Sequence, residues 1–107
     1  PNIGRILQAL GAACGRRGIN LDSGKLTLDI GDRRVFEGGR FLLDGEAEKQ
    51  LSDYFLDCAL PLPNPGWPAH DKVVEIGIGL GTGSGRASVT GSDLSEDYVK
   101  INADYRT

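Results

Sequence analysis

The stretch "KLTLDIGDRRVFEGG", residues 25–39, decides the fold. In its first half apolar and polar residues alternate strictly, so Leu26, Leu28 and Ile30 share one face and the polar residues between them share the other. This period of two predicts a strand with one buried and one solvated face. The "GDRR" that follows is turn-forming, and "RVFEGG" (residues 34–39) predicts a shorter strand that returns as the hairpin partner.

Two helices are predicted on either side of this hairpin. Apolar residues at helical spacing indicate the first over residues 3–14, with Asn2 as its N-cap and Gly15 and Gly18 at its C-terminal end. Its apolar face consists of Ile3, Ile6, Leu7, Leu10 and Ala13 or Cys14. Asp44 is the predicted N-cap of the second helix. The apolar side of that helix consists of Ala47, Leu51, Tyr54, Phe55 and Cys58.

The second half of the chain returns to strand patterns. "KVVEIGIGLG", residues 72–81, alternates again, and after the turn "GTGSG" the segment "RASVTGSDL", residues 86–94, predicts a further strand that pairs with it. Repeated glycine on one face of a strand lets another backbone or a ligand approach closely. The order of elements predicts an α+β fold: a small, mainly antiparallel sheet with two helices packed on it and a short C-terminal helix.

The chain ends on "SEDYVKINADYRT", residues 95–107, which is dense in large side chains for a chain end. The pattern predicts a short helix capped by Ser95 and anchored by Tyr98, Val99 and Ile101. A polar cluster accompanies it and fits either the wall of a site or a helix end tied by local ion pairs. Its members are Asp93, Glu96, Asp97, Lys100, Asn102, Asp104 and Arg106.

Size and composition restrict the class of protein. A length of 107 residues with 39% hydrophobic and 25% charged residues predicts one soluble globular domain. The net charge of -3, with no basic stripe, argues against a nucleic-acid partner, and no apolar run is long enough to span a membrane. Cys14 and Cys58 are expected as buried free thiols, which suits a reducing cytoplasm. Because the chain lacks methionine and begins with Pro1, we expect it to be part of a longer, processed protein.

The residues offer little catalytic chemistry of their own. The glycines of "GIGLGTGSG", residues 77–85, keep a period of two and match neither a dinucleotide fingerprint nor a P-loop, so a hairpin is expected. His70, the single histidine, lies in a proline-rich loop over residues 60–71 and is expected to be a surface residue. Cys14 and Cys58 lack the polar, cationic surroundings of a nucleophile. No metal or other cofactor is expected.

Two segments nevertheless resemble a known family. "PNIGRIL", residues 1–7, resembles the "D-P-N-W-G-R-I-L" segment of the ornithine acetyltransferases, bifunctional enzymes of arginine biosynthesis. "GSDLSEDYVKINADYRT", residues 91–107, is similar to that family's carboxyl terminus, "G-C-D-L-T-Y-D-Y-V-K-I-N-A-D-Y-R-T". "LTLDIGDRRVFEGG" matches a strand-turn-strand segment of the family more loosely. The resemblance covers the whole chain, in order.

The resemblance implies an acyltransferase with an N-terminal nucleophile. In this family the precursor cleaves itself before a threonine, and the alpha and beta chains stay together as a hetero-oligomer. That threonine takes an acetyl group from N-acetylornithine and passes it to glutamate through an acyl-enzyme. Residues 1–107 would then be the C-terminal domain of the beta chain of a cytoplasmic enzyme. The nucleophile and the oxyanion hole would lie upstream, so no catalytic residue is expected in this chain.

The resemblance assigns substrate binding to two residues, Asn102 and Thr107. An amide offers two donors and an acceptor to an amino-acid substrate, and a terminal threonine offers a hydroxyl and a carboxylate. Three positions depart from the family: Ile3 replaces the usual Trp, Ser92 a common Cys and Glu96 a common Tyr. They leave open a divergent paralogue in a secondary-metabolite cluster, with an altered acyl donor or acceptor. An alternative of another class is a non-catalytic α+β binding module.

Overall fold

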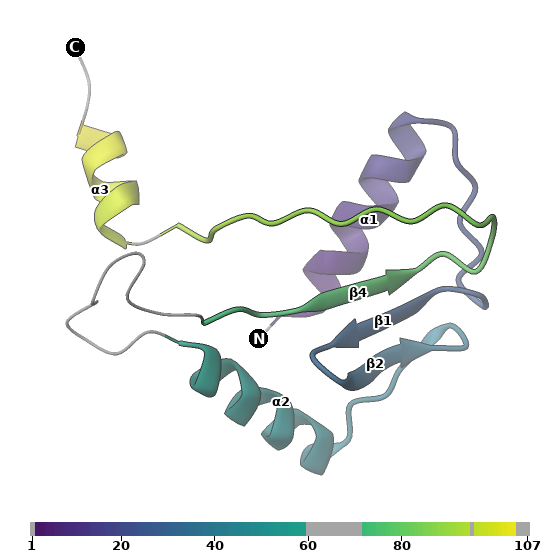
Figure 1. Cartoon of the computed structure of the whole chain (residues 1–107), viewed down its shortest axis with the longest axis horizontal. Coiled ribbons are helices and arrows are strands. Elements are labelled where there is room, and N and C mark those ends of the chain that lie inside the picture. The colour runs from purple at the N-terminus through teal and green to yellow at the C-terminus, as the bar shows by residue number, and fades with distance from the viewer. Residues whose placement is uncertain (1, 60–71, 95, 105–107) are drawn as a thin grey trace.

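The computed structural model describes residues 2–59, 72–94 and 96–104, and an antiparallel sheet forms its centre (Figure 1). The strands are β1 (Thr27–Ile30), β2 (Arg33–Glu37), β3 (Arg40–Phe41) and β4 (Ile76–Gly79), in the spatial order β3-β2-β1-β4. The helices are α1 (Gly4–Arg16), α2 (Gly45–Cys58) and α3 (Glu96–Asp104). This arrangement confirms the predicted α+β class.

The predicted hairpin is formed by β1 and β2, with one irregularity. Leu28 pairs with Phe36 and Asp29 pairs with Arg34, so Val35 has no opposite residue and forms a β-bulge. A bulge breaks the alternation of faces, and both Val35 and Phe36 are accordingly buried. The hairpin thus contributes two consecutive side chains to the core, where strict alternation would give one.

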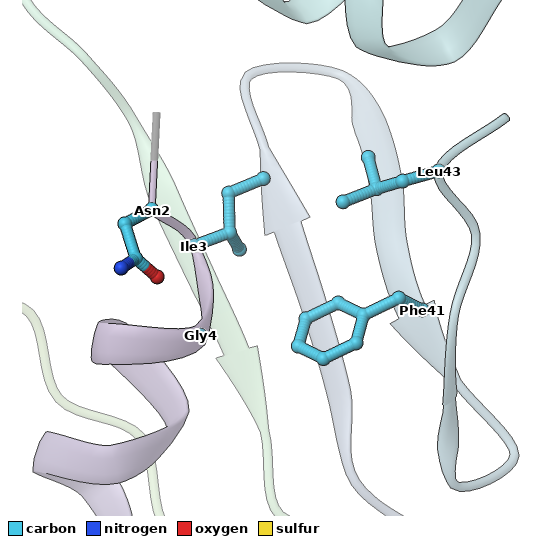
Figure 2. A pocket seen from close by; sticks show the side chains of 5 residues that line it. All are labelled: Asn2, Ile3, Gly4, Phe41 and Leu43. Carbon is cyan, nitrogen blue, oxygen red and sulfur yellow. The ribbon is translucent and has the colours of Figure 1, made fainter. Parts of the chain in front are cut away.

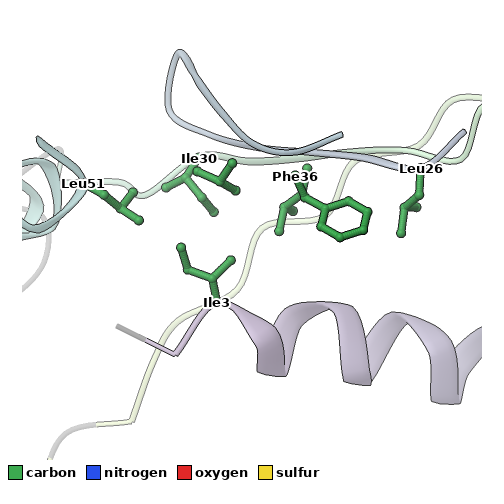
Figure 3. Close-up of a cluster of buried hydrophobic side chains, with 7 residues drawn as sticks. Ile3, Leu26, Ile30, Phe36 and Leu51 are labelled. Atoms are coloured by element: carbon green, nitrogen blue, oxygen red, sulfur yellow. The ribbon is translucent and has the colours of Figure 1, made fainter. Parts of the chain in front are cut away.

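The core lies on the apolar face of this hairpin (Figure 3). Leu28 and Ile30 of β1 are 0% and 1% exposed, which confirms the face predicted from the alternation. Ile3, at the start of α1, points at the sheet, and Leu51 of α2 packs beside Ile30. Side chains that are only partly buried surround this cluster: Ile6, Leu7, Leu10, Leu43, Tyr54, Phe55 and Leu80. Both predicted helices therefore pack on the sheet.

The helix ends agree with the sequence at two places and differ at one. The Asp44 carboxylate accepts a hydrogen bond from the Ala47 N–H at 2.8 Å, which confirms the cap of α2. Gly18 ends α1 with φ +66°, a conformation that favours glycine. The prediction of Asn2 as the N-cap of α1 is wrong. Ile3 holds that position without a side-chain cap. Because Ile3 is buried in the core, the helix begins at Gly4, one residue later than a cap at Asn2 would place it.

A tyrosine connects α2 to the start of β4. The Tyr54 hydroxyl accepts a hydrogen bond from the Glu75 N–H at 3.1 Å, and the Glu75 carbonyl accepts one from the Gly31 N–H at 2.9 Å. Gly31 follows β1 and has φ +60°, so the turn of the hairpin, the helix and β4 meet at this point. The sequence alone predicted Tyr54 only as an apolar helix residue.

The C-terminal third departs from the predictions. β4 is shorter than the predicted strand, and residues 86–94 form no strand, so the predicted pairing is wrong. Tyr98, Val99 and Ile101 are 53%, 52% and 65% exposed, so the predicted anchoring of the tail is also wrong in this chain. In both places the described part of the chain supplies no apolar surface to cover these side chains. The proline-rich loop with His70 lies outside the described residues. Within them, no helix is long and apolar enough to cross a membrane.

Candidate functional site

Asn102, the first of the two predicted substrate-binding residues, lies on the exposed surface of α3. Its Nδ2 donates a hydrogen bond to the Tyr98 carbonyl, one turn earlier, at 2.8 Å. Within the described part of the chain the Oδ1 atom has no partner, so an acceptor and a second N–H are available to a ligand. Thr107 lies outside the described residues. The pairing of Asn102 with Thr107 in one site stays a prediction.

The polar cluster around Asn102 is open to solvent. Over residues 96–104 no ion pair forms, but the cluster also includes Arg106, so the interpretation as a helix end tied by local ion pairs stays a prediction. Glu96 and Asp97 lie in the first turn of α3, where the helix dipole favours acidic side chains. Arg106 lies outside the described residues. The helix therefore carries its polar groups on a surface that other protein or ligand atoms can reach.

The solvated face of the sheet carries two ion pairs that share Arg34, and the sequence pattern did not predict them. Arg34 Nε lies 2.8 Å from Asp29 Oδ1, and Arg34 Nη1 lies 2.8 Å from Glu37 Oε1. The hydrogen bonds to Asp29 and then to Glu37 raise the pKa of the Arg34 guanidinium above its ordinary value. Asp29 and Arg34 are opposite each other across β1 and β2, so the strand register would have indicated the pair.

A shallow hollow of about 370 Å³ lies between the start of α1 and β3 (Figure 2). The side chains of Ile3, Phe41 and Leu43 point toward one another across it, and Asn2 lies at its rim. None of the described residues that line it carries an acidic or basic side chain. It can accept an apolar side chain from another part of a protein.

The glycine-rich segment around β4 fits closely against β1. Gly79 pairs with Thr27, and a Cβ atom built on Gly79 would collide with the Thr27 hydroxyl. A Cβ atom on Gly81 would lie 2.6 Å from the Lys25 carbonyl oxygen. Of the two interpretations of these glycines, the close approach of another chain segment is confirmed. A turn rather than a helix follows β4, so the segment is not a dinucleotide-binding loop.

Among the described residues, neither cysteine belongs to a group of side chains that could hold a metal ion. Cys14 and Cys58 are both free, as predicted, although Cys58 is only partly buried. The Cys58 thiol donates a hydrogen bond to the Val73 carbonyl at 3.3 Å. Across residues 2–59, 72–94 and 96–104, no group of three or more His, Cys, Asp or Glu side chains could hold a metal ion. His70 is outside these ranges.

The comparisons with known proteins concern the whole chain. The family model that matches, the ArgJ family, covers residues 1–107. Relatives named "Arginine biosynthesis bifunctional protein ArgJ" include those of Prochlorococcus marinus (strain NATL2A), 36% identical over 107 residues, and Dehalococcoides mccartyi (strain CBDB1), 39% identical over 108 residues. The protein of Thermosynechococcus vestitus is 37% identical over 108 residues. No solved structure matches the chain.

The coverage of these alignments is unequal. Each takes in 100% of this chain, but only 23%, 22% and 24% of the Prochlorococcus, Dehalococcoides and Thermosynechococcus proteins. The chain thus spans less than a quarter of the length of these relatives. The agreement of a full-length family match with relatives above 30% identity confirms the predicted resemblance. The chain belongs to the ArgJ family of arginine-biosynthesis proteins.

Proposed function

We propose that the parent protein of this chain is a cytoplasmic glutamate N-acetyltransferase that moves an acetyl group from N-acetylornithine to glutamate. The observation that carries the proposal is the ArgJ family match over residues 1–107, which includes the tail motif. Residues 1–107 form the C-terminal domain of the beta chain. The acyl group is held on a threonine upstream, and the remainder of the beta chain and the alpha chain are the protein partners.

In this proposal the chain positions the substrate and does not perform the bond-making step. Both substrates are amino acids, which need partners for a carboxylate or an ammonium. Within the described residues the Asn102 amide makes a single, local hydrogen bond to Tyr98, which leaves donor and acceptor capacity for them. Thr107 supplies a hydroxyl at the end of the same tail. Such positioning residues contribute by holding the substrate near the nucleophile.

The test is an acetyl-transfer assay on the processed parent protein. Incubation with N-acetylornithine and glutamate is expected to yield N-acetylglutamate and ornithine without acetyl-CoA. Transfer to a different amine, with glutamate ignored, would instead identify a paralogue with an altered acceptor. If a folded, processed parent transfers no acetyl group from N-acetylornithine to any amino acid, the proposal is wrong and a binding module remains.

Replacing Asn102 with alanine is expected to weaken substrate binding more than it weakens the fold. Loss of a hydrogen bond costs about 0.5–1.5 kcal/mol, so KM for one substrate should rise about 2- to 13-fold while kcat changes little. Steady-state kinetics of the parent protein measure this split. Asn20→Ala, a second exposed asparagine outside α3, is the matched control and should leave KM unchanged. A lowered melting temperature with unchanged KM would show that Asn102 has a structural role.

A further inference from the structure

The outer edge of β4 is open. Among the strands of the described chain, β4 has β1 as its single neighbour, and it ends the sheet. The Gly31 N–H donates to the Glu75 carbonyl, which makes these two a hydrogen-bonded pair. Hydrogen-bonded and non-hydrogen-bonded pairs alternate along an antiparallel ladder, so the pairs of Ile76 and Ile78 with β1 are of the second kind. The N–H and C=O groups of Ile76 and Ile78 therefore point away from β1, toward the open edge.

The side chains of the same two residues form the uncovered end of the core. Ile78 pairs with Leu28 and Ile76 pairs with Ile30, so all four lie on the core face of the sheet. Leu28 and Ile30 are 0% and 1% exposed, whereas Ile76 and Ile78 are 50% and 43% exposed. The core is complete under β1 and incomplete under β4, where one more layer of apolar side chains would continue it.

A groove runs along this edge. Its volume is about 1160 Å³, and residues 76–83 and 85–88 line it, so the returning chain forms its second wall. In Figure 1 that chain continues beyond residue 88 past β4 toward α3 without a strand. Val89 and Leu94 on this segment are 96% and 64% exposed. A backbone edge, two apolar side chains and an exposed second wall are the elements of a strand-addition site.

We propose that a β-strand from the rest of the parent ArgJ protein pairs with β4 in this groove. Its backbone would hydrogen-bond to Ile76 and Ile78, and alternate apolar side chains would cover those two residues. The Prochlorococcus relative extends well beyond the 23% of its length that this chain matches, so a parent of similar length has ample chain to supply the strand. The inference rests on the family membership that also underlies the proposed function.

Hydrogen exchange in the full parent protein tests the backbone pairing. The amides of Ile76 and Ile78 point outward, so only a strand docked in the groove can accept hydrogen bonds from them. With that strand in place, we expect both amides to exchange about 100-fold or more slowly than in an unstructured peptide. Ile78→Pro removes an outward donor without removing a bond to β1, and it should lower the protection of Ile76 about tenfold. Ile78→Val is the matched control and should retain the protection. Exchange of both amides at unstructured rates in the wild-type parent would overturn the proposal, whatever the proline variant does.

Photocrosslinking identifies the occupant. A benzoylphenylalanine in place of Ala87, in the wall of the groove, should crosslink in the parent protein to a segment upstream of residue 1 of this chain. The same probe in place of the exposed Leu56 on α2 is the control and should not give that product. A crosslink to residues 74–80 would mean that the wall itself closes on β4. A crosslink between light and heavy isotope-labelled molecules, mixed before irradiation, would mean that a second copy of the protein occupies the groove. Either result would overturn the proposal.

The outcome is independent of the acetyl-transfer assay. An active parent with unprotected Ile76 and Ile78 amides would remove this inference and leave the proposed function standing. A parent with protected amides and the upstream crosslink but no acetyl transfer would remove the proposed function and leave this inference standing.

Discussion

Replacing Leu28 with alanine is expected to lower the free energy of unfolding by about 2–5 kcal/mol, among the largest effects of any single substitution in this chain. Leu28 is 0% exposed, pairs with Phe36 on one side and Ile78 on the other, and so lies at the middle of the apolar face of the sheet. Truncation removes apolar contacts and leaves a cavity that a hydrogen-bonded sheet cannot collapse to fill. Hydrogen exchange of the β1 amides in the parent protein measures the change in free energy.

The matched control for this experiment is Leu56→Ala. Leu56 belongs to α2 and is 69% exposed, so the same change of side chain removes little buried surface and should change the free energy by no more than about 0.5 kcal/mol. Equal effects of the two substitutions would contradict the assignment of the core to the face of β1 that carries Leu28. A large effect at Leu56 alone would indicate that another part of the parent protein covers α2.

The hairpin and the two helices that pack on it could be predicted from the sequence because their signals are local. Alternation fixed which face of β1 is buried, and Asp44 marked the first turn of α2 three residues before the N–H that it binds. The predicted cap at Asn2 was wrong because the preference of asparagine for a capping position competes with the burial of its neighbour Ile3, which is 5% exposed. The bulge at Val35 depends on the pairing of two strands and has no signal within either one.

The C-terminal third could not be predicted because its apolar pattern indicates burial without saying what provides it. Val89, Tyr98 and Ile101 have the spacing of buried residues, yet all three are more than half exposed in this chain. A periodic pattern reports the environment that a segment meets in the whole protein, and less than a quarter of the relatives' length is present here. The predicted partner for residues 72–81 was the next segment in the chain, whereas the open edge of β4 fits a strand from elsewhere.

The candidate site, like the C-terminal third, has little local signal in the sequence. No local pattern distinguishes Asn102 from any other exposed amide, and its assignment came only from the resemblance of the tail to a family. The structure adds that its side chain is accessible and bonded only to Tyr98 within the described residues. The groove beside β4 had no signal in the sequence, since it depends on the register that points the backbone of Ile76 and Ile78 outward.

Replacing Gly81 with alanine is expected to destabilise the junction of β4 and the following turn by about 2–5 kcal/mol, from two additive causes. Its φ of +70° disfavours any residue with a Cβ atom by about 1–2 kcal/mol. The new Cβ would also lie 2.6 Å from both the carbonyl oxygen and the Cβ of Lys25, so backbone atoms must move, at a cost of about 1–3 kcal/mol. Hydrogen exchange of the Gly77 and Gly79 amides in the parent protein measures the effect.

Gly83, two residues further along the same turn, separates these causes. Its φ is +72°, nearly that of Gly81, but no atom lies within 4 Å of the position that its Cβ would take. Gly83→Ala should therefore cost only the conformational part, about 1–2 kcal/mol, and the difference between the two variants is the cost of the contact with Lys25. If the two substitutions have equal effects, the turn after β4 does not lie against Lys25 as closely as the position of Gly81 requires. A larger effect at Gly81 would show that this glycine lets the turn after β4 pack against Lys25, just before β1.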